Sequence, residues 1–303
     1  MRILLTGGAG FIGASIIRRL LARDDSVRVL DVAAKNPLLE PKSESDRRLE
    51  WRVGSVSDGP AVMDAVKGCD AIIHLAALLT PACAADPIRA AGVNVIGTLN
   101  MFEAARRHGL KGVLYMSSAA VYASDLRDHP HPDTHYGAFK LAGEGSARAY
   151  WTDHRVASIG LRPYVVYGMG REVGLTAGPA LACRAAVEQR EYVIPFTGPA
   201  DFVYVDDVAS AFVEAAAELG KGRSGASVFD IPGSTALVED IVTIIQRHVA
   251  GARLSAAGPL LPIQMPAKLN DIRAAITNIT RTPLDAGLKM MIDRYAQLRV
   301  AGR

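Results

Sequence analysis

Cysteine, aromatic residues and long apolar runs are all scarce in this sequence. Its 303 residues include 3 cysteines, placed far apart, so neither a disulfide scaffold nor a zinc module built on cysteine pairs is indicated. No apolar run approaches the ~20 residues of a membrane-spanning helix, and the apolar start lacks the cleavage site of a signal peptide. With 34 Lys and Arg against 31 Asp and Glu, the charge excess is too small for an obligate nucleic-acid binder. We therefore expect a cytoplasmic protein with reduced thiols that binds neither membranes nor nucleic acids.

Apolar residues make up half of the chain, which is enough for a sizeable core. Over the first 163 residues, short apolar runs alternate with segments of helical periodicity. The runs predict strands at 2–6, 27–30, 71–75, 113–117 and 157–161 and another ending at Val53, and the periodic segments predict helices at 11–23, 87–108 and 136–153. Strands separated by helices pair in parallel with right-handed crossovers, so we expect a doubly wound α/β sheet. Further helices are expected at 237–249 and 283–300.

A glycine-rich segment between the first strand and the first helix is the strongest local signal. It reads Thr6-Gly7-Gly8-Ala9-Gly10-Phe11-Ile12-Gly13. Gly7 permits a tight turn, Gly10 lets the backbone approach a pyrophosphate, and Gly13 lets the helix pack close to the sheet. Phe11 and Ile12 begin the helix, whose free N–H groups face the phosphates. A tight strand–helix turn without a ligand is the alternative interpretation.

Asp31 ends the second strand, eighteen residues after Gly13. A carboxylate there accepts hydrogen bonds from a ribose 2′-hydroxyl and repels a 2′-phosphate. No arginine follows directly, and Lys35 is the one residue that weakens the preference. We therefore predict NAD rather than NADP as the cofactor.

Several further motifs follow in a fixed order along nearly the whole chain. With these motifs the chain resembles the extended short-chain dehydrogenase/reductase superfamily, and within it the NAD-dependent epimerase/dehydratase family. Beyond the glycine-rich segment they are His74–Ala77, Asn94, Ser117–Tyr122, Tyr136–Lys140, Leu161–Pro163, Val166–Gly168 and Asp201–Val208. The resemblance implies a Rossmann-type NAD-binding domain at 1–167 and 201–231 and a smaller, mostly helical substrate lobe at 168–200 and 232–303. It also implies a homodimer.

The resemblance implies a catalytic set of Ser118, Tyr136 and Lys140. Ser118 would hydrogen-bond the substrate oxygen, Tyr136 would be the general acid or base at the carbinol, and Lys140 would hold the nicotinamide ribose. Tyr136 and Lys140 stand at i and i+4, hence on one helix face. A nearby ammonium group and the positive nicotinamide ring both lower the pKa of a tyrosine. The alternative is that Tyr136 and Lys140 form an ordinary surface pair and that Ser118 is a loop serine, with no catalytic role.

Further cofactor contacts are implied by the same resemblance. They come from Ser55, Val56, Leu75, Ala76, Ala77, Asn94, Ser117 and Pro163, in addition to the residues above. Asn94 would support the active-site helix through backbone contacts. Ser55 stands where many relatives have an aspartate, so its contact with the adenine is weakly indicated.

Departures from the family pattern bear on the substrate. Ala119 and Ala120 stand where dehydratases carry an acid pair, which argues against dehydration. Val165 and Ala200 stand where nucleotide-sugar enzymes often carry an asparagine and an arginine. Since a diphosphate needs polar or charged partners, we expect a small substrate such as a sugar, a sugar acid or a similar polyol.

Three residues are weaker candidates for substrate contacts. Arg171 either pairs with a carboxylate or is a solvated loop arginine, Thr176 could hydrogen-bond a hydroxyl, and His135 adjoins Tyr136. The stretch 128–135 holds three histidines and two aspartates, but its prolines favour a turn-rich helix entry and we predict no metal site.

Three functions fit these residues. The leading hypothesis is an NAD-dependent oxidoreductase acting on a secondary alcohol. The second is an epimerase of the same family, which would return the hydride to the opposite face. The third is a catalytically silent dinucleotide sensor, which the presence of Tyr136 and Lys140 disfavours.

Overall fold

A parallel sheet of seven strands forms the centre of the molecule. The structure is a computed structural model that describes residues 1–122, 129–261 and 268–300. The strands follow the order β10-β6-β5-β4-β1-β2-β3, and all neighbours pair in parallel. In chain order they are β1 (Arg2–Thr6), β2 (Ser26–Asp31), β3 (Leu49–Val53), β4 (Ala71–His74), β5 (Val113–Met116), β6 (Ser158–Pro163) and β10 (Ala226–Ile231). The predicted parallel sheet is therefore confirmed.

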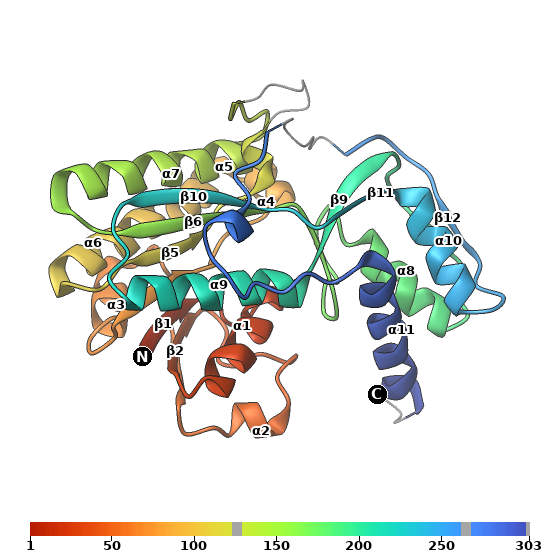
Figure 1. The fold of residues 1–303 in the computed structure, drawn as a ribbon, viewed down its shortest axis with the longest axis horizontal. Helices are drawn as coiled ribbons and strands as arrows, with labels where there is room; N and C mark the ends of the chain where they lie inside the picture. Colours follow the sequence, from red (N-terminus) through yellow and green to blue (C-terminus); the bar gives the residue numbers. More distant parts are fainter. Residues whose placement is uncertain (123–128, 262–267, 301–303) are drawn as a thin grey trace.

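Helices cover both faces of this sheet, as a doubly wound fold requires. On one face α1 (Phe11–Ala22) packs against α9 (Val205–Gly220), and on the other α6 (Gly97–His108) lies beside α7 (His135–His154) (Figure 1). Two clusters of buried apolar side chains fill the spaces between the helices and the sheet. Shorter helices on the loops are α2 (Pro41–Glu44), α3 (Gly59–Ala65) and α4 (Thr80–Ala85).

The helix predicted at 87–108 has a change of winding in its middle. The chain forms α5 (Pro87–Ala91), a π-helical turn η1 (Gly92–Ile96) and then α6. A π turn holds one more residue than an α turn, and such turns often occur at functional sites. Here the turn brings Gly92 and Val93 to a cavity described below, while Asn94 is buried. Sequence periodicity predicts the helix but does not reveal this interruption.

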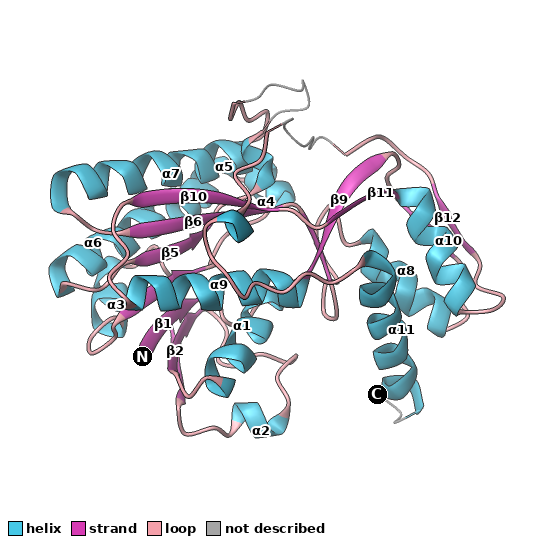
Figure 2. Ribbon diagram, viewed as in Figure 1, coloured by secondary structure: helices cyan, strands magenta, loops and turns pink. Residues whose placement is uncertain are grey.

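A smaller unit lies beside the sheet, on the right of Figure 1. Figure 2 shows that it combines helices with short strands. Its own apolar cluster is packed between α8 (Gly178–Val187), α10 (Val238–His248) and α11 (Leu284–Val300). The strands β7 (Val165–Tyr167), β9 (Pro199–Tyr204) and β11 (Ser234–Leu237) form one sheet, and β8 (Tyr192–Ile194) and β12 (Leu254–Ala256) form another. Two short 3₁₀ turns are η2 (Ala119–Val121) and η3 (Ile272–Ala274).

Asp207 ties the end of the chain to the larger unit. This buried carboxylate, in the first turn of α9, accepts hydrogen bonds from Thr280 Oγ1 at 2.8 Å and from the Thr282 backbone N–H at 2.7 Å. The segment that leads into α11 is thereby fixed across α9. The domain division at 167, 200 and 231 stays a prediction, since β9 pairs with β7 and β11 whereas α9 packs on α1.

Two further properties of the described residues concern membrane-spanning helices and cysteines. No helix in this part of the chain has the length and apolar character needed to cross a bilayer. Cys69, Cys83 and Cys183 are free thiols, and all three are buried.

Candidate active site

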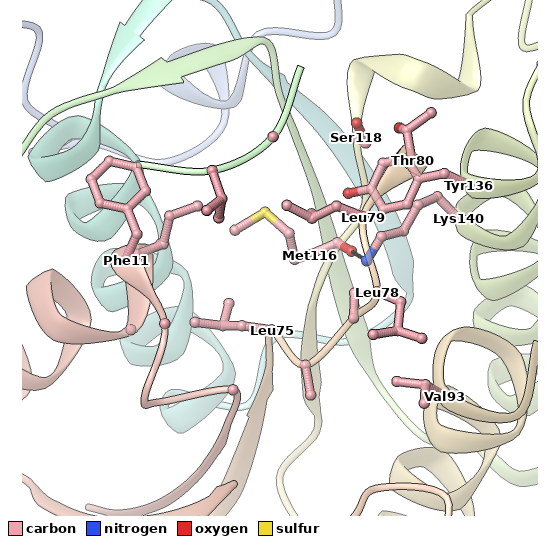
Figure 3. A pocket seen from close by; sticks show the side chains of 18 of the residues that line it. Phe11, Leu75, Leu78, Leu79, Thr80, Val93, Met116, Ser118, Tyr136 and Lys140 are labelled. Atoms are coloured by element: carbon pink, nitrogen blue, oxygen red, sulfur yellow. Dashed lines mark hydrogen bonds between the residues drawn. The ribbon is translucent and has the colours of Figure 1, made fainter. Parts of the chain in front are cut away.

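A cavity of about 970 Å³ opens at the carboxyl ends of the sheet strands, which is where ligands bind in open α/β sheets. Figure 3 shows it with Phe11 and Leu75 on one side and Tyr136 and Lys140 on the other. Most of the predicted site residues line it: Gly7, Gly10, Phe11, Ile12, Gly13, Asp31, Ser55, Val56, Leu75, Ala76, Ala77, Ser117, Ser118, Tyr136, Lys140, Pro163, Arg171 and Thr176.

The glycine-rich segment forms a backbone cradle at one end of the cavity, which we call the cofactor end. Gly7 has φ +74°, and a Cβ there would lie 2.6 Å from the Ala76 backbone nitrogen, so only glycine fits this turn. Gly10 precedes α1 without a side-chain cap, and the first turn of α1 carries no acidic residue. The backbone N–H groups of this turn are therefore available for an anion, and the cradle fits a pyrophosphate.

Asp31 lies at the same end, at the last position of β2. Its Oδ2 accepts a hydrogen bond from the Ala9 N–H at 2.9 Å, and its Oδ1 accepts one from the Ala33 N–H at 3.1 Å. The carboxylate thus connects the end of β2 to the glycine-rich segment. Lys35 is exposed and does not line the cavity.

Asn36 also belongs to this end, although the sequence did not predict it. It is 1% exposed, and its Nδ2 donates to the carbonyl oxygens of Gly8 at 2.8 Å and Gly10 at 2.9 Å. Its Oδ1 accepts from the Leu38 N–H at 2.8 Å. By binding these two carbonyls, Asn36 fixes the orientation of the peptide groups in the cradle. An asparagine after a strand reads as an ordinary turn residue, so the sequence carries no signal for this role.

Tyr136, Lys140 and Ser118 lie together at the opposite end, which we call the substrate end (Figure 3). Lys140 is buried on α7, and its Nζ donates to the Met116 carbonyl at 2.7 Å. The same Nζ lies 5.5 Å from the centre of the Tyr136 ring. The helical spacing of these two residues therefore gives the shared face that the sequence predicts.

Burial governs the ionisation of both groups. It raises the pKa of Tyr136 to about 12, against the opposing influence of the Ser118 hydroxyl and the Arg171 guanidinium. It also lowers the pKa of Lys140 to about 8. In the protein alone the phenol therefore keeps its proton at neutral pH, and additional positive charge near it would be needed to make it a base.

The absence of a side chain at Gly137 allows Tyr136 to approach Ser118. A Cβ at this position would lie 2.0 Å from the Ala120 carbonyl oxygen, so the start of α7 packs directly on the turn η2. The Thr134 Oγ1 caps α7 by accepting from the Gly137 N–H at 3.1 Å. The role of Gly137 could not be predicted from the sequence, because it depends on the Ala120 carbonyl that faces it in the fold.

A second missed feature is a buried polar network behind the site. Ser117 Oγ donates to Glu144 Oε1 at 2.5 Å, and Arg162 Nε donates to the same oxygen at 2.7 Å. Arg162 Nη1 donates to the Tyr122 hydroxyl at 2.6 Å. The network joins the ends of β5 and β6 to α7. It holds the residue next to Ser118 in place.

Two predicted site residues do not line the cavity. Asn94 is buried and binds the loop after β4, accepting from the Leu78 N–H at 2.8 Å and donating to the Leu78 carbonyl at 2.9 Å. That is a supporting role for a segment that does line the cavity. His135 is exposed at the start of α7, where its ring stacks on Phe139 with centroids 6.0 Å apart.

The histidine-rich stretch before α7 gives no metal site among the residues described. His129 and His131 are exposed. Within the described ranges, no group of three or more His, Cys, Asp or Glu side chains is arranged to hold a metal ion. Residue 128, which belongs to this stretch, lies outside the described residues.

Comparison with known proteins places the chain in a family. A family model described as the NAD dependent epimerase/dehydratase family matches residues 3–231. The chain is 31% identical over 294 residues to a UDP-glucose 4-epimerase of Mycolicibacterium smegmatis, covering 93% of this chain and 91% of that protein. It is 31% identical over 168 residues to a uronate dehydrogenase of Pseudomonas putida, covering 53% of this chain and 59% of that protein.

A solved structure agrees with this assignment at the level of the fold. The UDP-glucose 4-epimerase of Thermus thermophilus, in complex with NAD, matches with a TM-score of 0.80 at 23% identity over 97% of this chain and 99% of that chain. The predicted family, fold class and cofactor are confirmed. This chain belongs to the NAD-dependent epimerase/dehydratase family, a family of enzymes whose cofactor is NAD.

Proposed function

We propose that this protein oxidises a secondary alcohol of a small polyol-like substrate, such as a sugar or a sugar acid. One observation carries the proposal: the glycine-rich cradle and the Ser118, Tyr136 and Lys140 side chains line a single cavity. Bound NAD supplies the acceptor for the hydride that leaves the carbinol carbon.

The protein's own groups handle the proton. Ser118 orients the substrate hydroxyl, and Tyr136 takes its proton as the carbinol becomes a carbonyl. The buried ammonium of Lys140 lies close enough to the Tyr136 ring to stabilise the phenolate that this requires. The predicted cofactor contacts, with Asp31 at the ribose, orient the other reactant.

The walls of the substrate end support a small substrate. Val165 and Ala120 line the cavity without offering a polar side chain, and Ala200 is buried in β9 and is not part of the lining. A diphosphate held there would lack the two side-chain partners expected from the family pattern. The uronate dehydrogenase relative favours a sugar acid among the small substrates.

Epimerisation with retained cofactor is the second candidate. It is favoured by the alignment with a UDP-glucose 4-epimerase, which extends over 93% of the chain. The same three side chains would serve, with the proton returned to the oxygen after the hydride is returned to the carbon.

We also propose that residues 1–167 and 201–231 form the NAD-binding domain and that residues 168–200 and 232–303 form the substrate lobe. We propose in addition that the protein is a homodimer, which analytical ultracentrifugation would measure.

One experiment separates the two candidates. The protein is incubated with excess NAD and each of a panel of aldoses, sugar acids and nucleotide sugars, and NADH absorbance is followed while the sugars are analysed. NADH that accumulates in proportion to a consumed sugar supports the dehydrogenase. An isomerised sugar without net NADH supports the epimerase, and if that sugar is a nucleotide sugar, the argument from Val165 and Ala200 is wrong.

A further inference from the structure

Arg171 occupies an unusual position for an arginine in a loop. It follows β7 and lines the substrate end of the cavity. Its Nη2 donates to Thr176 Oγ1 at 3.1 Å, but its Nε is buried and has no hydrogen-bond partner among the described residues. Burial also lowers the pKa of the guanidinium. A desolvated cation with an unused donor is unfavourable in the absence of a ligand, because the lost hydration is not replaced.

The surroundings of Arg171 favour an anion. Of the described residues that line the cavity, Asp31 is the only one with a carboxylate, and it stands at the cofactor end. Arg171 is close enough to the reacting end for its charge to lower the pKa of Tyr136. A negatively charged group bound to Arg171 would therefore lie near the hydroxyl that Ser118 and Tyr136 address.

The rest of the substrate end offers few partners for further hydroxyl groups. Figure 3 shows Leu79 beside Tyr136, together with Thr80, which carries a hydroxyl group. Val173 and Leu175 line the same end and are 71% and 43% exposed. The hydroxyl of Thr176 is already engaged by Arg171. Among the described residues the site thus offers Arg171 for one anionic group, Ser118 and Tyr136 for the reacting hydroxyl and Thr80 for a further polar contact, while Leu79, Val173 and Leu175 form an apolar wall.

We propose that the substrate is a hydroxy acid whose carboxylate binds Arg171 while its secondary alcohol lies between Ser118 and Tyr136. The inference rests on the proposed function and narrows its substrate class. A carboxylate matches the fork of a guanidinium and supplies an acceptor for the free Nε–H. A neutral analogue would leave that donor unpaired, which is the strongest kind of discrimination a polar site can make. A sugar acid and an aliphatic hydroxy acid share this chemistry.

Binding to the NAD-saturated protein tests the proposal without requiring turnover. Isothermal titration compares each acid with its neutral partner: D-galacturonate with D-galactose, and 3-hydroxybutyrate with 1,3-butanediol. At least one acid is expected to bind about 10- to 100-fold more tightly than its partner, as for a hydrogen bond to a charged group. The pair that shows the larger difference indicates whether the acid is polyhydroxylated or aliphatic.

Variants then assign the effect to Arg171. Arg171→Gln should abolish the advantage of the acid and leave the neutral compound unaffected, and Arg171→Lys, which keeps the charge but loses the fork, should lose part of it. Arg190→Gln is the matched control, because Arg190 is exposed and does not line the cavity. Thermal unfolding verifies that each variant is folded.

The possible results have separate meanings. If no acid binds, if neutral partners bind equally well, or if Arg171→Gln and Arg171→Lys both retain the full preference, the inference is overturned. NADH formed from a neutral alcohol alone would overturn it while leaving the proposed oxidation intact. An acid that binds through Arg171 but yields neither NADH nor an isomer would uphold the carboxylate site and refute the proposed function.

Discussion

The two ends of the cavity are built on different principles. At the cofactor end the cradle is backbone, fixed by the parallel sheet and by buried hydrogen bonds from Asn36 to the carbonyls of Gly8 and Gly10. At the substrate end the lining includes the exposed loop residues Val173 and Leu175. It also includes Arg171, whose Nε has no hydrogen-bond partner in the described part of the chain. At the cofactor end the chain's own hydrogen bonds fix the orientation of the free N–H groups, whereas at the substrate end a loop side chain keeps a buried donor without a partner among the described residues. A fixed cofactor site and an adaptable substrate site can in this way coexist in one fold.

Tyr136→Phe should separate the two ends most strongly. The substitution removes the proton acceptor but keeps the aromatic ring, so turnover should fall about 1000-fold. The dissociation constant of NAD should stay within about twofold, since no group at the cofactor end is altered. NADH formation and NAD-dependent quenching of protein fluorescence measure the two effects. Tyr150→Phe is the control, since Tyr150 lies on the same helix with its ring stacked on Phe102, outside the cavity. Full turnover by Tyr136→Phe would refute the assignment of the base.

Gly137→Ala should disturb the substrate end through packing alone. The added methyl group would meet the Ala120 carbonyl oxygen, so α7 must shift away from η2 at a cost of about 2 kcal/mol in unfolding free energy. Turnover should fall because the shift of α7 moves Tyr136 away from Ser118. NAD binding should be retained. Gly145→Ala is the matched control on α7, because the nearest atom to its new Cβ would be 3.9 Å away. Equal stability losses in urea unfolding of both variants would contradict the packing argument.

Lys140, at the substrate end, should make the unfolding free energy of the protein depend on pH. Its pKa is about 8 in the folded protein and near 10.5 when unfolded, so between these values the unfolded state binds the extra proton and stability rises with pH. Urea unfolding should show the wild type gaining about 1.5 kcal/mol between pH 8 and 9.5 relative to Lys140→Met. Lys289→Met, which removes an exposed lysine on α11, should behave like the wild type. If the unfolding free energies of the wild type and of Lys140→Met changed with pH in parallel, the Lys140 ammonium would not be desolvated.

Asp31→Ala should produce the smallest of these effects, confined to the cofactor end. Loss of the carboxylate should weaken NAD binding about fivefold, equivalent to roughly 1 kcal/mol. The KM of the substrate should not change, because Asp31 lies at the opposite end of the cavity. Asp293→Ala removes an exposed carboxylate on α11 and serves as the control. Tighter binding of NADP than of NAD by the unmodified protein would overturn the role given to Asp31.

Sequence reasoning succeeded where structure is decided locally. The sheet strands of the first 163 residues and the helices predicted at 11–23, 87–108 and 136–153 follow from apolar runs, helical periodicity and the glycine-rich segment, and most predicted site residues line one cavity. The short helices α2, α3 and α4 were not predicted. The smaller unit was harder to predict because its strands are three to six residues long and pair with distant segments, as β12 does with β8. Only the two helices with a clear apolar face, α10 and α11, could be anticipated there.

The residues that the sequence did not reveal act through contacts with distant partners. Asn36 holds carbonyls 26 and 28 positions earlier in the chain, and Glu144 accepts from Ser117 across 27 positions. Gly137 matters because of the Ala120 carbonyl that faces it. None of these residues belongs to an apolar pattern of period 2 or 3.6, so hydrophobic periodicity cannot identify them.

The hydrogen bond from the Ala9 N–H to Asp31 limits how the cofactor preference of this enzyme can be redesigned. Replacing Asp31 with an apolar or basic residue, in order to admit a 2′-phosphate, would also leave the Ala9 N–H of the glycine-rich segment without its acceptor. A redesign for NADP must therefore supply a new acceptor for that N–H, for example from an asparagine or serine at the same position. With the role proposed for Asp31, one carboxylate both selects the ribose and orders the glycine-rich segment, so an exchange of cofactors has to preserve the second contribution while changing the first.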